Sequence, residues 1–388
     1  MFDTMMRLFH MGSPPTVPKG KTTVRFGMLG AARIGPAGLI LPARSHAEAV
    51  VVAVASRDTA KVTAYAKKHR IPRTYDGTNC YESLLKDPEV DAVYIALPNG
   101  LHHSWALRAL NHGKHVLVEK PMANTAEECR ELISLAESKG LVLLEAIHYT
   151  FHPALQRFKE IVASGELGAI KRVKAEFAVP SIISGLFFLK DDVRFDFSLG
   201  GGVMMDMGVY SLSAIRYVTS NNPVKVGEAT AIGHAGDPPN IDKSMNAHLV
   251  LPSSVSGDLY VDFSMPGWGP FGMIPRALKT AIIVELEEGT VELSNFPLPH
   301  IFNTITIRPK VGKKRTESVY RFKDGRGEEW WTTYRYQLEA FIDRVQGRSP
   351  QTWPSSDEPA IQMEWVDEIY RAAGMPRRPN SVPIAPSN

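Results

Sequence analysis

The sequence predicts an α/β protein with two domains, the first of which contains a parallel, doubly wound sheet. Three observations support this prediction. The chain has 388 residues, and chains of this length usually divide into two domains, each with its own hydrophobic core. From residue 23 to about residue 150, short apolar segments alternate with amphipathic helical ones. After residue 150 the rhythm changes to longer strand-like segments joined by turns, so the boundary is placed there.

The first part contains five strand candidates that are apolar almost throughout, as strands covered on both faces are. They read "VRFGMLG", "AVVVAVAS", "DAVYIALP", "HVLVE" and "LVLLEA". Between them lie helical stretches at residues 58–69, 101–112 and 125–139, the last closed by Gly140. Asp58 is well placed to cap the first of these helices. Strands that alternate with helices indicate a parallel sheet.

The second part predicts longer strands, several of which alternate polar and apolar residues. They are "IKRVKAEFAVP", "VKVGEATAIGH", "KSMNAHLVLP", "SGDLYVDFSMP", "KTAIIVELEEGTVELSN" and "ITIRPK". Such alternation is expected of a sheet with one wetter face. Helices at residues 334–345 and 358–373 complete the prediction, so the domains are a leader at 1–22, a first domain at 23–150 and a second at 151–388.

The composition is that of a globular protein without an extreme charge. Hydrophobic residues make up 44% and charged residues 22%, and the formal net charge is +3. This argues against a nucleic-acid partner. No run of residues is long and apolar enough for a membrane span, and residues 1–22 lack the pattern of a secretory signal. The two cysteines have neither a CxxC spacing nor the spacing of metal ligands. We therefore expect a cytoplasmic protein without a membrane association, a disulfide or a metal site.

A glycine-rich turn after the first strand predicts a nucleotide site. Gly30, Ala32 and Gly35 follow the GxGxxG spacing, with alanine at the middle position. The first glycine allows a tight turn, a small second residue lets the backbone approach a pyrophosphate, and the following helix offers unpaired amides. The same spacing also occurs in turns without a ligand, but the position after the first strand of a βαβ run favours the nucleotide.

The end of the second strand favours NADP over NAD. An NAD-binding protein usually has an acidic residue here for the ribose hydroxyls. This chain instead has Ser56 and Arg57, with Lys61 one helical turn further on. A hydroxyl and two cationic groups suit a 2′-phosphate, which a carboxylate would repel.

Three longer segments resemble the glucose–fructose oxidoreductase/inositol dehydrogenase/MocA family. They are "GMLGAARIG", "YIALPNGLHHSWALRALNHGKHVLVEKPMA" and "DVRFDFSLGGGVMMDMGVYSL", and the resemblance covers residues 23–375 in collinear order. Within the family, the match is nearest to dihydrodiol dehydrogenases and to fungal NADP-dependent D-xylose 1-dehydrogenases. The resemblance implies a Rossmann domain followed by an α/β domain with a large open, mainly antiparallel sheet, and an active site between them.

The resemblance also implies the catalytic residues. The segment Glu119-Lys120-Pro121 matches the family's EKP motif, whose lysine lies beside the nicotinamide and the reacting hydroxyl, often before a cis proline. We therefore expect a cis Lys120–Pro121 bond. Tyr210 would accept the substrate proton, the Lys120 ammonium would favour the phenolate and polarise the substrate oxygen, and Asp206 would orient the lysine or the substrate. Asp206 and Tyr210, four apart, share one face of the expected helix.

Other residues match positions near the cofactor or the substrate. With the residues above, the expected cofactor-binding set is Gly30, Ala31, Ala32, Arg33, Ile34, Ser56, Arg57, Lys61, Leu97, Pro98, Asn99, His102, Glu119 and Lys120. The substrate candidates are His148, Tyr149, His152 and Arg194. Relatives commonly carry arginine where this chain has Thr150, which puts one cationic contact in doubt.

Together these residues predict an NADP-dependent enzyme that oxidises an aldopyranose, with D-xylose favoured, at C1 to the lactone. The alternatives are a trans-dihydrodiol dehydrogenase, a dicarbonyl or anhydrosugar reductase, and a non-catalytic NADP-sensing regulator. The resemblance also predicts a homodimer formed through the C-terminal sheet.

Overall fold

The computed structural model describes residues 2–187, 193–234 and 240–383, and these form two compact units. Of the described residues, the first unit comprises 2–152, 323–360 and 380–383, and the second comprises 153–187, 193–234, 240–322 and 361–379. The two C-terminal segments of the first unit are ones that the sequence pattern assigns to the second domain. One of these segments contains a helix, Thr333–Val345, that packs on the helical turns Pro36–Arg44 and His148–Phe151, and the other binds the Gly100 carbonyl through the Val382 amide. No local sequence pattern indicates these contacts.

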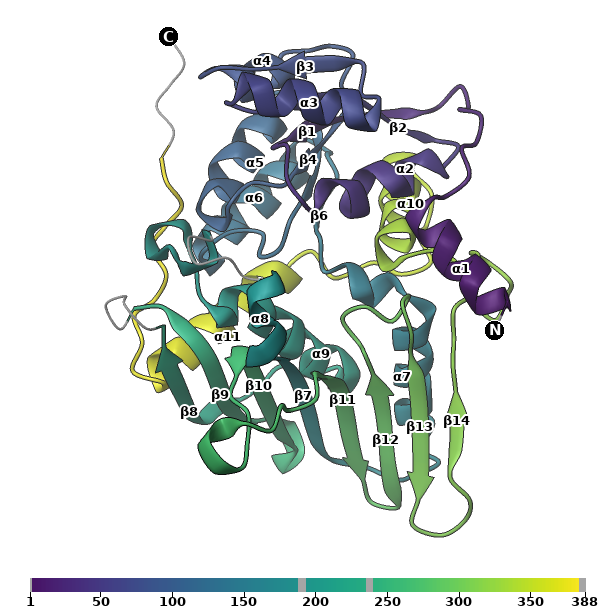
Figure 1. The fold of residues 1–388 in the computed structure, drawn as a ribbon, viewed down its shortest axis with the longest axis vertical. Coiled ribbons are helices and arrows are strands. Elements are labelled where there is room, and N and C mark those ends of the chain that lie inside the picture. The colour runs from purple at the N-terminus through teal and green to yellow at the C-terminus, as the bar shows by residue number, and fades with distance from the viewer. Residues whose placement is uncertain (1, 188–192, 235–239, 384–388) are drawn as a thin grey trace. The chain divides into compact units, whose positions relative to one another are not determined.

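The first unit is built on a six-stranded parallel sheet in the order β3-β2-β1-β4-β5-β6 (Figure 1). This is the strand order of a dinucleotide-binding Rossmann fold. β1, β4 and β5 are almost entirely buried, as their apolar sequences predict. The strands are β1 (Val24–Leu29), β2 (Ala49–Ala55), β3 (Arg73–Tyr75), β4 (Ala92–Ile95), β5 (His115–Val118) and β6 (Leu143–Glu145).

The helices of this unit confirm the predicted ones and add several. Asp58 caps the helix after β2, because its carboxylate accepts the Lys61 amide at 2.9 Å, and Gly140 closes a later helix at φ +64°. The elements are α1 (Phe2–Gly12), α2 (Leu41–Arg44), α3 (Thr59–His69), α4 (Cys80–Leu85), α5 (His102–Asn111), α6 (Ala126–Ser138) and α10 (Thr333–Val345). The short helix α4 and strand β3 have no sequence signal strong enough to predict them.

The helix after β1 starts differently from the expectation. Residues Pro36–Ile40 form a π-helical turn, and the α-helical conformation begins only with α2. Pro36 is at the first position, where its missing amide hydrogen costs no helical hydrogen bond, whereas Pro42 removes one further along. Gly38 lies inside the turn, where a β-carbon would overlap the Tyr94 hydroxyl.

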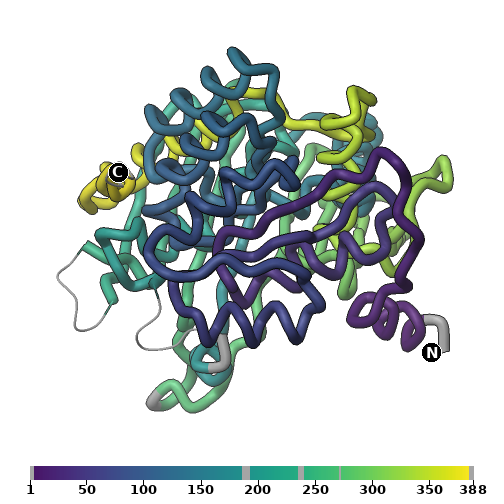
Figure 2. Tube along the Cα trace, turned by 90° about the horizontal axis from the view of Figure 1, so that it is seen from above, coloured from purple at the N-terminus to yellow at the C-terminus, as the bar shows by residue number. Residues whose placement is uncertain are grey.

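Residues 1–22, predicted as a loose leader, contain helix α1. It lies at the periphery of the chain trace (Figure 2), and His10 contacts the Trp330 ring with 6.0 Å between centroids. Met5 and Phe9 on this helix are more than half exposed.

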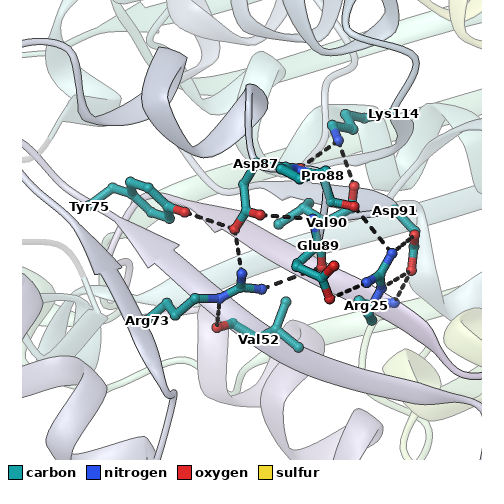
Figure 3. Close-up of polar contacts among 10 residues, drawn as sticks. All are labelled: Arg25, Val52, Arg73, Tyr75, Asp87, Pro88, Glu89, Val90, Asp91 and Lys114. Carbon is teal, nitrogen blue, oxygen red and sulfur yellow. Dashed lines mark hydrogen bonds and ion pairs between the residues drawn. The ribbon is translucent and has the colours of Figure 1, made fainter.

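The amino ends of the strands are held by a network of paired charges (Figure 3). Arg25 at the start of β1 donates from Nε and Nη2 to the Asp91 carboxylate before β4, at 2.8 and 2.7 Å. Asp87 accepts from the Tyr75 hydroxyl at 2.7 Å and pairs with Arg73 at 2.8 Å. Lys114, just before β5, donates to two backbone carbonyls. These contacts therefore tie β1, β3 and the start of β5 to the segment that precedes β4.

The second unit is built on an eight-stranded sheet in the order β14-β13-β12-β11-β7-β10-β9-β8. Among the described strands of this sheet, β7 and β10 pair parallel and the other pairs are antiparallel, which confirms the predicted, mainly antiparallel sheet. The strands are β7 (Ile170–Pro180), β8 (Lys225–Gly233), β9 (Asp242–Val250), β10 (Ser256–Met265), β11 (Lys279–Leu286), β12 (Gly289–Ser294), β13 (Thr304–Pro309) and β14 (Arg315–Glu317).

Helices α7 (Pro153–Ala163) and α9 (Val209–Thr219) pack against strands of this sheet, α7 on β12 and α9 on β7 and β10. Burial alternates along β12, as it does along a strand with one covered face. The other face carries paired polar side chains, including Arg172 with Asp258 and Lys279 with Glu176. Helix α8 (Ser181–Phe187) follows β7, and α11 (Glu358–Ala372) belongs to this unit from Ile361 onward.

Candidate active site

The glycine-rich turn lies at the carboxyl end of β1 and requires its first glycine. Gly30 adopts φ +104°, and a β-carbon there would lie 2.7 Å from the Ala96 carbonyl oxygen at the end of β4. The Ala32 carbonyl accepts hydrogen bonds from the Gly35 amide at 3.2 Å and the Tyr65 hydroxyl at 3.1 Å. Ala31 is buried, whereas Arg33 is exposed. The turn is therefore tight, and hydrogen bonds from Gly35 and Tyr65 fix it. A fixed, tight turn lets the backbone approach a pyrophosphate closely.

The residues that favour NADP follow β2. Ser56 is buried and its amide donates to the Tyr75 carbonyl at 3.1 Å, so the strand end is fixed. Arg57 and Lys61 are exposed at the start of α3. Two cations and one hydroxyl therefore gather at the start of one helix, where its dipole also favours an anion.

The turn after β4 contains Leu97, Pro98 and Asn99, which were expected among the cofactor-binding residues. Its next residue, Gly100, is anchored from the far C-terminus, because the Val382 amide donates to the Gly100 carbonyl at 2.7 Å. Ser104 in turn donates to the Val382 carbonyl at 2.8 Å. This C-terminal anchor has no local sequence signal.

His102, expected among the cofactor contacts, has a fully buried ring. Its Nε2 lies 2.7 Å from the Leu97 carbonyl oxygen and its Nδ1 lies 2.8 Å from that of Pro121. Burial lowers the pKa of this imidazole, against the effect of the two carbonyls. The ring thus joins the loop after β4 to the loop after β5, and its side chain is occupied by this linkage.

The segment Glu119-Lys120-Pro121 follows β5, and the predicted cis bond between Lys120 and Pro121 is confirmed. The residues on both sides of the lysine are held. Glu119 accepts the Tyr94 hydroxyl at 2.5 Å, and the Met122 amide donates to the Glu145 carboxylate at 2.8 Å. Lys120 itself is half-buried. This is a rigid turn that presents one ammonium group at the carboxyl edge of the sheet, where open α/β sheets bind ligands.

The candidate substrate residues His148, Tyr149 and His152 are buried within the first unit. Their turn packs on α10: the His148 ring lies 4.0 Å from the Tyr334 ring, centroid to centroid, and the His152 ring lies 5.4 Å from that of Tyr336. Burial raises the pKa of Tyr334, and the nearby Glu119 carboxylate raises it further. The two tyrosines lie about 180 residues along the chain, so the sequence could not indicate them.

The second unit contains the other group of candidates. Asp206 lies in a π-helical turn, Met204–Gly208, that leads into α9, so the expected helix begins one turn later as an α-helix. Its carboxylate accepts the Arg194 Nε at 2.8 Å. Tyr210 is 7% exposed, and its ring meets that of Phe177 edge-on with 6.0 Å between centroids. The structure therefore brings Arg194 and Asp206 together as an ion pair.

Among the described residues, no group of three or more His, Cys, Asp or Glu side chains is placed to hold a metal ion. In the same part of the chain, no helix has the length and apolar character that a membrane crossing requires.

Family models match both units. Residues 24–147 match an oxidoreductase family with an NAD-binding Rossmann fold, GFO/IDH/MocA, and residues 155–292 match the C-terminal domain of the same family. The chain belongs to the GFO/IDH/MocA oxidoreductase family. The predicted family membership is thereby confirmed.

Two curated relatives are similar to this chain over much of their length. A D-xylose 1-dehydrogenase (NADP(+)) from Haloferax volcanii is 33% identical over 90% of this chain and 97% of its own. A trans-1,2-dihydrobenzene-1,2-diol dehydrogenase from Bos taurus is 35% identical over 58% of this chain and 62% of its own.

Solved structures of related oxidoreductases share the fold. An aldose-aldose oxidoreductase from Caulobacter crescentus, complexed with glycerol, superposes with a TM-score of 0.75 at 23% identity, covering 91% of this chain and 98% of its own. A 3-ketoreductase from Actinomadura kijaniata, in complex with NADP and TDP-benzene, gives 0.73 at 21% identity, covering 90% and 98%. At these identities the likeness concerns the fold.

Proposed function

We propose that the protein oxidises an aldopyranose, D-xylose in the first place, at C1 to the aldonolactone, with NADP⁺ as the hydride acceptor. The observation that carries this proposal is the similarity to the Haloferax D-xylose 1-dehydrogenase, which extends over nearly the whole of both chains. The rigid turn at Lys120 fits this chemistry, because it offers one fixed cation to a reacting oxygen.

The first unit fits a dinucleotide phosphate. Gly30 leaves room that a β-carbon would fill, and Ala31 to Ile34 offer backbone amides. Ser56, Arg57 and Lys61 would hold the 2′-phosphate, while the loops at Leu97–Asn99 and at Glu119 and Lys120 would border the nicotinamide end. His102 would support both of these loops through its contacts with the Leu97 and Pro121 carbonyls and would not contact the cofactor.

In the proposed mechanism, Tyr210 takes the proton from the C1 hydroxyl of the sugar. A tyrosine phenol in water has a pKa near 10, so a tyrosine base needs a neighbouring cation to act at neutral pH. Lys120 would provide that charge and polarise the same oxygen. Asp206, fixed by Arg194, would orient the sugar or the lysine. Bound NADP⁺ supplies the electrophilic C4 that receives the hydride.

The reaction balances as a two-electron oxidation. The C1–H bond breaks with its electron pair, the hydroxyl proton passes to the base, and the C1–O bond becomes a carbonyl. The lactone then hydrolyses to the aldonic acid. No further oxidant is required.

A second candidate is trans-dihydrodiol oxidation, which the similarity to the Bos taurus enzyme favours. The same residues would act on a vicinal diol, and only the substrate would differ. A dicarbonyl or anhydrosugar reductase would use the same groups in the reverse direction.

The test is NADPH formation by the purified protein with D-xylose, D-glucose, L-arabinose and a trans-dihydrodiol. We expect D-xylose to reduce NADP⁺ with the highest kcat/KM. Reaction of the diol alone would transfer the proposal to the second candidate. Tight NADP binding with no reaction of any substrate would favour a non-catalytic sensor.

We also propose a homodimer formed through the polar face of the eight-stranded sheet. Arg172 with Asp258, Lys279 with Glu176, and Arg308 with Glu292 give this face balanced charges, which suit a self-complementary contact. Light scattering at micromolar concentration should give twice the mass of one chain, and a monomer mass would contradict the proposal.

A further inference from the structure

We propose that Asp242 and Arg378 form a positioning pair that fixes the turn Gly200–Gly202 and, through it, Asp206 and Tyr210. The inference rests on the proposed function, because that function gives Asp206 and Tyr210 their importance. It adds two residues that lie far from them in the sequence, one at the start of β9 and one after α11.

The pair is completely buried. The side chains of Asp242 and Arg378 are both 0% exposed, and they form a short ion pair through Oδ1 and Nη2. The Tyr370 hydroxyl donates to the same carboxylate oxygen at 3.1 Å. The guanidinium also lies 4.0 Å from the centre of the Tyr370 ring and 5.2 Å from that of Phe197. Both charges are thus enclosed and removed from solvent.

The pair holds the glycine turn from both sides of Gly202. Arg378 donates from Nε to the Gly201 carbonyl at 2.6 Å, and the Met204 amide donates to the second Asp242 oxygen at 2.8 Å. Gly202 has φ +125°, and a β-carbon on it would overlap both the Asp242 carboxylate and the Arg378 guanidinium. The backbone of the turn therefore lies directly on the ion pair.

Hydrogen bonds connect the turn to Asp206 and to its partner Arg194. The Asp206 amide donates to the Gly202 carbonyl at 3.1 Å, and the Gly202 amide donates to the Arg194 carbonyl at 2.8 Å. Arg194 also binds the Asp206 carboxylate. A shift of Gly202 would therefore move both Asp206 and its partner, and with them the start of the helix that bears Tyr210.

Stability alone does not account for such a pair. Replacing a buried ion pair with apolar side chains of similar volume is often neutral or stabilising, whereas removing one partner leaves a costly unpaired charge. What apolar side chains cannot replace are the two directed hydrogen bonds to Gly201 and Met204. We therefore assign the pair to the geometry of the turn.

The test compares single and double variants by thermal unfolding, NADP dissociation constant, kcat and KM. We expect Asp242→Leu and Arg378→Met, each alone, to lower the melting temperature strongly. The double variant Asp242→Leu/Arg378→Met should recover stability but keep a kcat about 10- to 100-fold below wild type, because the turn is no longer held. Its NADP affinity should stay at the wild-type value, since the proposed cofactor residues belong to the other unit. A stable double variant with wild-type kcat would overturn the proposal.

Arg378→Lys provides a second test if the double variant does not fold. A lysine keeps a charge for Asp242, but its single nitrogen cannot occupy both the Nη2 position beside Asp242 and the Nε position beside Gly201, so the hydrogen bond to the Gly201 carbonyl should be weakened or lost. We expect a folded protein with a reduced kcat, and an unchanged kcat would contradict the proposal. The matched control is Arg377→Met, which removes the neighbouring arginine that pairs with Asp367 nearer the surface. Its kcat should remain that of wild type.

Failure of this inference can be distinguished from failure of the proposed function. An inactive Tyr210→Phe variant together with a fully active double variant would refute the positioning role alone. Full activity of Tyr210→Phe would refute the catalytic assignment on which both rest.

Discussion

The two edges of the parallel sheet use charged residues in opposite ways. At the amino edge, Arg25 and Asp91 form a bidentate pair, and Lys114 is buried against backbone carbonyls (Figure 3). At the carboxyl edge the loops are held mainly by hydrogen bonds to the backbone, such as those of the His102 ring, while Arg57 is exposed. One edge uses its charges to join strands, and the other supports loops that present charges to a ligand.

The difference between the two edges shows how one sheet can be stable and still present charged groups to a ligand. Charges that are satisfied within the protein contribute to cohesion but offer little to a substrate. The carboxyl edge therefore requires other supports, which are Gly30 for close approach, the buried His102, and the carboxylates of Glu119 and Glu145 beside Lys120. Substitutions at the two edges should consequently affect different measured quantities.

The largest effect is expected for Tyr210→Phe, which removes the proposed base of the second unit. We predict that kcat falls about 10²- to 10⁴-fold, the usual contribution of a positioned acid or base. The phenyl ring retains the packing against Phe177, so the melting temperature should change little. NADPH formation with saturating D-xylose provides the measurement, and a wild-type rate would remove Tyr210 from the mechanism.

A smaller effect is expected where the carboxyl edge meets the 2′-phosphate. The double variant Arg57→Ala/Lys61→Ala should lower kcat/KM for NADP⁺ about 10- to 100-fold, because a charge-assisted hydrogen bond is lost. The value for NAD⁺ should stay the same. Lys68→Ala, on an exposed position of the same helix, is the matched control. An equal loss of kcat/KM for NADP⁺ and NAD⁺ would show that these residues do not bind the 2′-phosphate.

His102→Leu tests the support beneath the carboxyl edge. The substitution removes the ring between the Leu97 and Pro121 carbonyls, one of which accepts the N–H of a neutral imidazole, so we expect the free energy of unfolding to fall by about 1–3 kcal/mol. The kcat should fall as well, because the loops on both sides of the ring move. His103→Leu is the control, since that neighbouring ring pairs with Glu131 instead. Denaturant titration and kcat together separate the two residues.

The smallest effect is expected at the amino edge. Asp91→Asn weakens a partly exposed pair with Arg25, so the free energy of unfolding should fall by about 1 kcal/mol at pH 7 with kcat unchanged. Burial opposes ionisation of Asp91, but the hydrogen bonds from Arg25 outweigh it and lower its pKa from 3.8.

This shift also predicts the pH dependence of the wild-type protein. Because the folded pKa is lower than the unfolded one, the contribution is complete above the unfolded value of about 3.8 and is lost as the pH falls through the folded pKa. Acid titration should therefore reduce the difference in unfolding free energy between wild type and Asp91→Asn. A difference that grows in acid would contradict this explanation.

Local sequence signals were sufficient for much of the fold. Strand β7 was predicted at its observed bounds, and the cap at Asp58 and the cis bond before Pro121 are also confirmed. Each depends on periodicity, on neighbouring residues or on a long family motif. The NADP-favouring residues and the catalytic set remain predictions.

What the sequence could not provide depends on contacts between distant residues. The π-helical turn Pro36–Ile40 has the Tyr94 hydroxyl, from β4, packed against Gly38. Arg378 holds a turn about 177 residues away, and Val382 holds Gly100. No pattern within a window of the sequence indicates such partners, so these supports emerged only from the structure.

The most direct test of the central claim compares two lysines of the same sheet. Lys120→Met and Lys114→Met should be measured for kcat with saturating D-xylose and NADP⁺, and for unfolding free energy. We predict that Lys120→Met keeps its stability and loses kcat by at least about 10²-fold, while Lys114→Met loses stability and keeps its kcat. Wild-type turnover in a folded Lys120→Met variant would contradict the account.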